Sequence, residues 1–383
     1  MDADQHGSTL AVVLVAAILL SACGRDAVVP EGPNSPGRAT DVRVAGSKDV
    51  RYPSIEPANA EGMTPCPLLF RFEGREFRIS VPVQQSVLLG ARGARRTAQY
   101  VEGRRPHDLE SRLHLAFVQD PSLDAFYESV LECLRPLKRQ LELDSNGYLE
   151  LIAAVVQHIP YEEGTAKTRF PIEVVADNAG DCDEKSHLLA GLLAREGFSV
   201  ALLSFDADDH MALGVRADGL EFRSTGYMMV ETTSPMLPGG VMVGTPSRSL
   251  RGGDFVIPVA DGPLSYTATS DLLFIQSSLA DLRARQDAMA KELEVESAVC
   301  EELARQIRSA DLEVQRLRGS GSPKVPAEVA RRNELVRRHN AAVDVQRSLV
   351  EDHNRIVDVL NRTRTLAAAR RPLAAMLRDA MKD

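Results

Sequence analysis

The feature that most constrains the fold of this chain is a heptad pattern in its C-terminal third. From Ile275 to Leu317 the pattern positions alternate at spacings of four and three residues, and only Gln286 and Glu296 interrupt the apolar series. A 3.5-residue period sustained over about six heptads is typical of a coiled-coil helix and not of a globular one. The positions are Ile275, Leu279, Leu282, Gln286, Met289, Leu293, Glu296, Cys300, Leu303, Ile307, Ala310, Val314 and Leu317.

A second long helix is predicted after the short break "GSGSPKVP", residues 319–326. Because the break is short, we expect an antiparallel coiled-coil hairpin over residues 270–366. Its first arm would be about 70 Å long at 1.5 Å per residue. Pro372 is expected to end the second helix, with a short terminal helix in residues 367–383. In the second arm, Val329, Val336, Val343, Val350 and Val357 recur every seven residues, accompanied by Asn333, Asn340, Asn354 and Asn361 at another heptad position.

The N-terminus carries an eleven-residue apolar run, Leu10–Leu20, followed by "LSAC". The run is too short to span a bilayer and has the length of a signal-peptide core. It resembles a bacterial lipoprotein signal, which implies that residues 1–22 are removed and that a lipid on Cys23 anchors the chain in the cell envelope. The segment "MDADQHGST" departs from such signals because it lacks Lys and Arg. A protein that is not secreted is the alternative.

An α+β domain is predicted between this signal and the coiled coil, over residues 63–262. Residues 23–62 are rich in Pro, Gly, Ser and charge, which indicates a flexible tether. The domain is expected to begin with a β-hairpin in "CPLLFRFEGREFRISVPV", where apolar residues alternate on both sides of "EGRE". Helices are expected at 121–140, at 146–159 and, with an amphipathic pattern, from residue 182. Short strands at 198–205, 210–215 and 226–233 follow closely enough to favour an antiparallel sheet, with loop and edge segments after them.

Charge and cysteine usage limit the partners of this chain. The net charge of -9 argues against nucleic acid, because phosphate binding needs a basic surface. No cysteine spacing of the CxxC type predicts a zinc site, and the "DADD" run at 206–209 lacks the spaced ligands of a calcium loop. No cofactor or metal is therefore expected. Cys66 and Cys133 are better explained as buried thiols than as a disulfide, and Cys300 as a small apolar side chain of the coiled coil.

One cysteine stands in a place that suits chemistry. In "AGDCDEKS", Gly180 lets the backbone turn and Cys182 opens a helix, where free N–H groups and the helix dipole lower the pKa of a thiol. We therefore predict that Cys182 is a nucleophile. Its own N–H would help to bind an oxyanion. Gln157, on the preceding helix, is a second candidate donor, although a surface or capping amide is an equally good interpretation.

A nucleophilic thiol needs a base and a group that orients the base. Of the eight histidines, His6 lies in the signal segment, while His339 and His353 lie in the coiled coil. His187 is five residues after Cys182, about 140° around the same helix, and faces away from it. His210 begins a strand, and the next strand brings Glu231 in "VETT". We expect His210 to be the base and Glu231 the orienting acid.

These residues lie in a run with a familiar order. The segment "RFPIEVVADNAGDCDEKSHLLAGLLAREGFSVALLSF", followed by "HMALGV" and "YMMVETT", resembles the transglutaminase-like superfamily of papain-like thiol enzymes over about 90 residues. The resemblance implies a cysteine-bearing helix packed on an antiparallel sheet, with Cys182 as nucleophile, His210 as base and Glu231 as orienting acid. Glu231 departs from the Asp that is commoner in the superfamily.

The resemblance also implies the reaction. Such an enzyme would form a thioester with amide groups of proteins or peptides, and water as the acceptor would make it a peptidase or amidase. An amine acceptor would make it a crosslinking enzyme, which is the less frequent outcome for bacterial members. The alternative is an inactive scaffold lipoprotein. In either case the coiled coil is expected to bind a protein partner, to self-associate or to act as a spacer.

Overall fold

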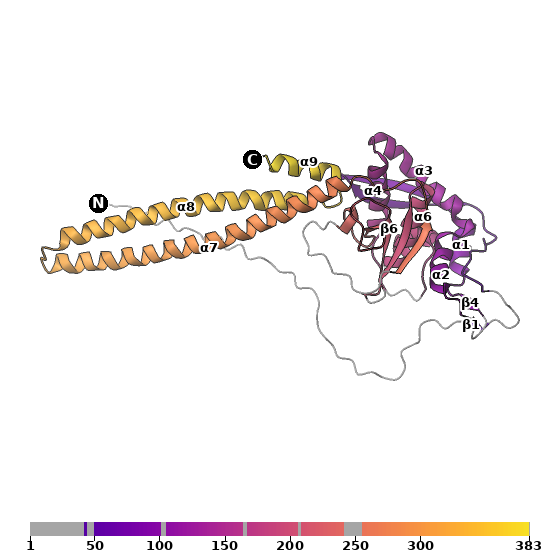
Figure 1. Cartoon of the computed structure of the whole chain (residues 1–383), viewed down its shortest axis with the longest axis horizontal. Coiled ribbons are helices and arrows are strands. Elements are labelled where there is room, and N and C mark those ends of the chain that lie inside the picture. Colours follow the sequence, from indigo (N-terminus) through magenta and orange to yellow (C-terminus); the bar gives the residue numbers. More distant parts are fainter. Residues whose placement is uncertain are drawn as a thin grey trace. The chain divides into compact units, whose positions relative to one another are not determined.

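The computed structural model describes residues 42–43, 50–100, 105–163, 167–205, 208–240 and 255–382. The expected signal peptide, Cys23 and the first part of the expected tether lie outside these ranges. Among the described helices, none combines the length and the apolar composition that crossing a membrane requires. Figure 1 shows the domain and the C-terminal helices.

The N-terminal β-hairpin has the form that the sequence predicts. Strands β2 (Met63–Phe72) and β3 (Arg75–Gln84) pair antiparallel, with Phe72 opposite Arg75. Glu73 and Gly74 between them have φ values of 49° and 77°, and positive φ at both turn residues matches the twist of a tight hairpin. The alternating apolar residues form one buried face, which packs on the core.

The ordered domain begins earlier than the composition of the tether suggests. Residues 50–62 were expected to be tether, yet Ile55 is only 5% exposed and its N–H donates to Asp120 Oδ2 at 2.7 Å. Arg51 pairs with Gln99 next to a parallel bridge between β1 (Val42–Arg43) and β4 (Gln99–Tyr100). Two buried apolar side chains, Pro53 and Ile55, and a few satisfied backbone groups hold a segment that is otherwise mostly polar.

Helices surround the centre of the domain. The predicted helices at 121–140 and 146–159 are present, the first with an initial 3-10 turn at Pro121–Leu123. Three further helices are short, and no pattern in the sequence predicts them. The helices before the cysteine are α1 (Gln85–Gly93), α2 (Leu109–Val118), α3 (Asp124–Gln140), α4 (Ser145–Gln157) and α5 (Pro171–Asp177).

The main sheet is antiparallel and has the order β7-β6-β5-β8. The three predicted strands correspond to β5, β6 and β7. The fourth strand, β8, comes from the segment that was expected as loop and edge, and it lies at the edge of the sheet beside β5. Helix α6 (Cys182–Arg195) packs on β5 and β6 (Figure 1). The strands are β5 (Val200–Phe205), β6 (His210–Val215), β7 (Met228–Val230) and β8 (Phe255–Ala260).

Helix α6 is buried on almost all sides and does not have the polar outer face of an amphipathic helix. Its polar residues Glu184, Lys185, Ser186 and His187 are all 0% exposed. The reason is that α2, α3, α4 and α5 pack against α6 in addition to the sheet. Each buried polar group needs a partner inside the protein, because an unpaired one is costly.

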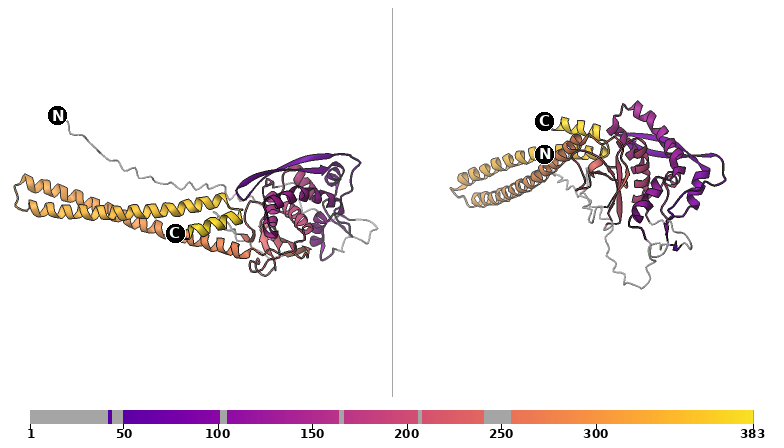
Figure 2. Two further views of the ribbon diagram at one scale, coloured as in Figure 1. Left: turned by 90° about the horizontal axis from the view of Figure 1, so that it is seen from above. Right: turned by 45° about the vertical axis from the view of Figure 1, so that its right-hand side comes forward.

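The predicted hairpin of long helices is present. Helices α7 (Thr269–Gly319) and α8 (Val325–Thr365) lie side by side and antiparallel, as the three views of Figures 1 and 2 show. With 51 residues, α7 is about 76 Å long. The residues of its predicted heptad pattern are all buried or half-buried. The expectation for Pro372 was wrong, because α8 ends at Thr365 and Pro372 lies in the first turn of α9 (Arg370–Ala380).

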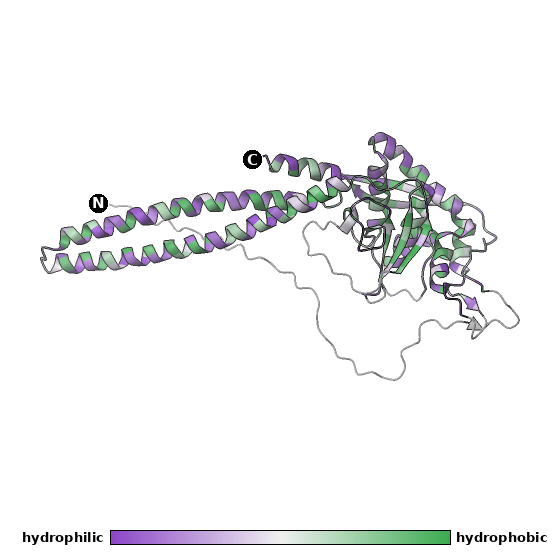
Figure 3. Ribbon diagram, in the orientation of Figure 1, coloured by the Kyte–Doolittle hydropathy of each residue, from purple (hydrophilic) through white to green (hydrophobic). Residues whose placement is uncertain are grey.

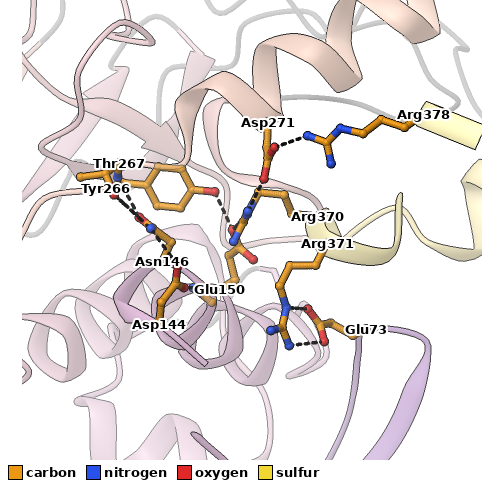
Figure 4. A network of polar contacts seen from close by, with 11 residues as sticks. Glu73, Asp144, Asn146, Glu150, Tyr266, Thr267, Asp271, Arg370, Arg371 and Arg378 are labelled. Atoms are coloured by element: carbon orange, nitrogen blue, oxygen red, sulfur yellow. Dashed lines mark hydrogen bonds and ion pairs between the residues drawn. The ribbon is translucent and has the colours of Figure 1, made fainter. Parts of the chain in front are cut away.

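A network of charged side chains joins the base of the hairpin to the domain (Figure 4). Arg370 donates to Glu150 Oε1 at 2.6 Å and to Asp271 Oδ2 at 2.5 Å, and the hydroxyl of Tyr266 also donates to Glu150 Oε1, at 2.5 Å. Arg371 makes a two-pronged ion pair with Glu73 in the turn of the β-hairpin. Arg370 and Glu150 are each only 4% exposed, so this is a buried ion pair.

Candidate active site

The N-terminus of α6 is held by a reciprocal cap. The Asp181 carboxylate accepts the N–H of Glu184 at 3.0 Å, and the Glu184 carboxylate accepts the N–H of Asp181 at 3.1 Å. This capping box makes Cys182 the first residue of the helix, as the sequence predicts. Within the part of the chain that the structure describes, the N–H of Cys182 has no acceptor, so it is free to bind a ligand oxygen.

The Cys182 thiol is protected, and its pKa is not low. The residue is 8% exposed, and its S–H donates to Asp183 Oδ1 at 3.5 Å. Burial raises the pKa of the thiol to about 12, and the nearby charges of Asp183 and Asp181 act in the same direction. The backbone N–H of Met211 faces the sulfur and lowers the pKa, but it does not outweigh these effects. The expected low pKa was therefore wrong, because desolvation and two carboxylates exceed the effect of a helix terminus.

The structure brings His210 and Glu231 together from neighbouring strands. His210 is the first residue of β6, and Glu231 directly follows β7, its antiparallel neighbour. The distance from His210 Nε2 to Glu231 Oε2 is 3.0 Å. With Nε2–H donated to the carboxylate, the other ring nitrogen, Nδ1, carries the lone pair that can accept a proton.

The "VETT" segment makes Glu231 a fixed anion. Its second oxygen, Oε1, accepts the N–H groups of Thr232 and Thr233, both at 2.9 Å, and the Thr233 hydroxyl at 2.7 Å. Burial raises the pKa of Glu231, but the hydrogen bond and charge of His210, together with Thr233, hold the pKa at about 2. The carboxylate is thus ionised and aimed at the imidazole. Glu231 has one methylene more than Asp, and the hydrogen bonds from Thr232 and Thr233 hold its carboxylate in place.

The sulfur is adjacent to the histidine strand without being bonded to the ring. The sulfur faces the N–H of Met211, which directly follows His210. In the described residues, no hydrogen bond joins the Cys182 sulfur to His210, since the thiol donates to Asp183 instead.

Gln157 does not have the role that was expected. It is 3% exposed, and its amide nitrogen donates to the carbonyl oxygens of Glu231 at 2.8 Å and Met236 at 3.1 Å. Both amide hydrogens are therefore in use, and none is left for an oxyanion. Gln157 is a positioning residue, because it ties the end of α4 to the backbone of Glu231.

Lys185 is a site residue that the sequence analysis missed. It is 0% exposed, one turn after Cys182, and its Nζ donates to the carbonyl oxygens of Gln157, Ile159 and Thr233 at 3.2, 2.7 and 3.5 Å. Burial lowers the pKa of Lys185 to about 8, although the charge of Glu231 raises it. Lys185 thus links α6 both to the end of α4 and to the Glu231–Thr233 segment. No spacing in the sequence distinguishes it from a surface lysine.

His187 faces away from the site, as predicted. Its Nε2 lies 3.0 Å from Nδ1 of His114 in α2, and its ring stacks on Phe117. Burial lowers the pKa of His187 well below its usual value, and His114 adds to this effect. Tyr161, by contrast, lies near the cysteine and is 46% exposed, which places an aromatic side chain at the solvent side of the site.

The described part of the chain contains neither a disulfide nor a cluster of metal-ligating side chains. Cys66, Cys133, Cys182 and Cys300 are free thiols. In the described ranges, no group of three or more His, Cys, Asp or Glu side chains could hold a metal ion. No family model, curated protein or solved structure matches this chain. The transglutaminase-like resemblance therefore stays a prediction made from the residues themselves.

Proposed function

We propose that this chain is a thiol enzyme of transglutaminase-like type that attacks amide bonds of proteins or peptides. One observation carries the proposal. The His210 imidazole is held by the ionised Glu231 carboxylate, and the N–H of the next residue in the strand, Met211, faces the Cys182 sulfur. The free N–H of Cys182 supports it, because a donor at the helix start can bind a developing oxyanion.

In this mechanism the nucleophile is made during the attack. Because the pKa of Cys182 is about 12, the resting side chain is a neutral thiol. As the sulfur attacks the carbonyl carbon, His210 Nδ1 takes the thiol proton, and the imidazolium is stabilised by Glu231. The C–N bond then breaks, and the imidazolium returns its proton to the leaving amine. The thioester left on Cys182 is cleaved by water, with His210 again as base, which makes hydrolysis the outcome that we propose.

The location belongs to the same proposal. The apolar run and "LSAC" at the N-terminus support removal of residues 1–22 and a lipid on Cys23, which would hold the enzyme in a bacterial cell envelope. Protein or peptide substrates in that compartment are the class that we propose.

A second function is favoured by the resting thiol. Cys182 is 8% exposed, its pKa is about 12, and it donates to Asp183 and not to His210. These observations favour an inactive scaffold that keeps the fold of a thiol enzyme and acts through its helical hairpin.

Labelling of individual thiols separates the two functions. The full chain is treated with iodoacetamide near neutral pH, and the rate at each cysteine is followed by peptide mass spectrometry. An enzyme is expected to label Cys182 faster than Cys133, which is more exposed but has no histidine beside it in the described structure. His210→Ala should slow the labelling of Cys182 at least tenfold. His107→Ala, which changes an exposed histidine outside the site, should leave the labelling rate of Cys182 unchanged. Equally slow labelling of Cys66, Cys133, Cys182 and Cys300 would support the scaffold.

A further inference from the structure

Helix α8 uses one face to pack on α7. Leu335 and Ala342 pack with Leu303, Ile307 and Ala310 of α7, and Ile356 belongs to the main core. The α8 residues among these belong to one heptad row, which we call the packed row. Its members are all buried or half-buried: Leu335, Ala342, Leu349, Ile356 and Thr363.

A second heptad seam runs along α8 beside this one. Its asparagines are exposed, and its valines are half-buried except Val350, which is 41% exposed. The valines occupy one heptad position and the asparagines, with Arg347, occupy the other, so one of the two rows of this face is apolar and the other is polar. We call it the valine–asparagine seam; it consists of Val329, Asn333, Val336, Asn340, Val343, Arg347, Val350, Asn354, Val357 and Asn361.

The two helices of the hairpin do not cover each other fully. In the middle of α7, between Leu282 and Cys300, the heptad residues are only half-buried. On α8, the positions that alternate with the packed row are Arg332, His339, Gln346 and His353. Figure 3 shows hydrophobic residues interspersed with hydrophilic ones along the length of both helices. In a four-helix bundle each helix packs on two neighbours through two adjacent faces, and α8 has two such faces.

We propose that the valine–asparagine seam binds the same seam of a second copy of this chain, with the two α8 helices parallel. In a parallel pair, equal heptad positions face each other, so valine meets valine and asparagine meets asparagine. An asparagine amide has both donors and acceptors and can pair with its own kind. A seam that matches itself is what a twofold interface requires, and buried asparagines specify its register.

Charge supports a second copy over a charged partner. Arg347 is the single charged residue of the seam, and it lies 3.4 Å from Asp344 of the same helix, with 67% of its side chain exposed. Its long stem lets the charge stay in water at the edge of the interface. Arg347 is nevertheless the position where the two copies match least well.

The mass of the purified full chain in solution tests the proposal, measured by sedimentation equilibrium over a range of concentrations. A dimer is expected. The double variant Asn340→Asp/Asn354→Asp changes only exposed side chains and should weaken dimerisation at least tenfold by opposing like charges. The matched control Gln276→Glu/Gln315→Glu makes the same change of charge at exposed positions of α7 and should have no effect. Arg347→Asn completes the asparagine row and should strengthen the dimer.

Disulfide trapping tests the parallel arrangement. Under mild oxidation, Asn340→Cys should link two copies, whereas Leu312→Cys, which is 68% exposed on α7, should not. A chain that stays monomeric at all concentrations would overturn the proposal, as would a dimer that the Asn340→Asp/Asn354→Asp variant leaves unchanged. A dimer that is sensitive to those changes but not linked through Asn340→Cys would overturn the parallel orientation. None of these results depends on the proposed enzyme activity.

Discussion

Replacing Glu231 by glutamine changes the His210 pair with little change in shape. The glutamine oxygen can keep the three hydrogen bonds from Thr232 and Thr233, because these are all made to one carboxylate oxygen. The amide nitrogen then faces His210 Nε2 and donates a hydrogen where the carboxylate accepted one. The imidazole must respond by moving its proton to Nδ1, and Nδ1 is the atom that we expect to take the proton of the thiol.

The size of the effect follows from the pKa of Glu231. Burial raises this pKa, yet His210 and Thr233 hold it at about 2, against an ordinary value of 4.5. That difference favours the ionised carboxylate by about 3 kcal/mol. The His210 interaction is the largest contribution that lowers the pKa of Glu231. Loss of the charge-assisted hydrogen bond between the two side chains should cost about 2–3 kcal/mol. The corresponding rate loss is about 30- to 150-fold.

The assay is iodoacetamide labelling of Cys182 in Glu231→Gln, with Cys133 in the same sample as the internal reference. Glu221→Gln, outside the site, serves as the matched control. We expect a fall in the Cys182 rate within the stated range, an unchanged Cys133 rate and an unchanged melting temperature in the control. If Cys182 labels equally fast in Glu231→Gln and in the unmodified chain, the carboxylate does not act on the histidine and the mechanism is wrong.

Two further predictions concern stability. Arg370→Met leaves the buried Glu150 without its charged partner, with only the Tyr266 hydroxyl as a donor, and should lower the free energy of unfolding by about 3–5 kcal/mol. Arg370→Met/Glu150→Gln should recover most of this loss; denaturant titration measures both, and equal losses would contradict a buried ion pair. Because the pKa of His187 is lowered in the folded chain, the unfolded chain binds more protons below pH about 6.5. Each unit by which the pH is lowered below that value should therefore decrease the free energy of unfolding by up to about 1.4 kcal/mol. His187→Phe, which preserves the stacking on Phe117, should reduce this slope, and an unchanged slope would show that His187 is not responsible.

The elements that the sequence predicts well are those with a long or simple period. The hairpin of α7 and α8 follows from a heptad pattern of more than forty residues, and β2 and β3 follow from alternation around a two-residue turn. The start of α6 at Cys182 was predicted from Gly180 and the residues around it, and the structure shows that a local cap between Asp181 and Glu184 fixes it. Helices α1, α2 and α5 have seven to ten residues, which is too short for the period to be distinguished from chance.

The site was predicted in part. The contact between His210 and Glu231 could be anticipated because two neighbouring strands with a short connection bring their ends together. The roles of Gln157 and Lys185 could not, because both depend on carbonyl oxygens that come from segments between 26 and 79 residues away. An amide looks the same in the sequence whether its hydrogens are free or used.

By itself, the amino-acid sequence determined the hairpin of long helices, the N-terminal β-hairpin and the start of α6 at Cys182, since these depend on long periods or on side chains within one or two turns of each other. Only the tertiary structure decided that α6 is buried on nearly all sides, that the pKa of Cys182 is high and that the valines of α8 lie beside the packed row and not within it. The physical reason is that hydrogen-bond partners, desolvation and charge depend on atoms from distant parts of the chain, and the spacing of residues along one segment carries no record of them.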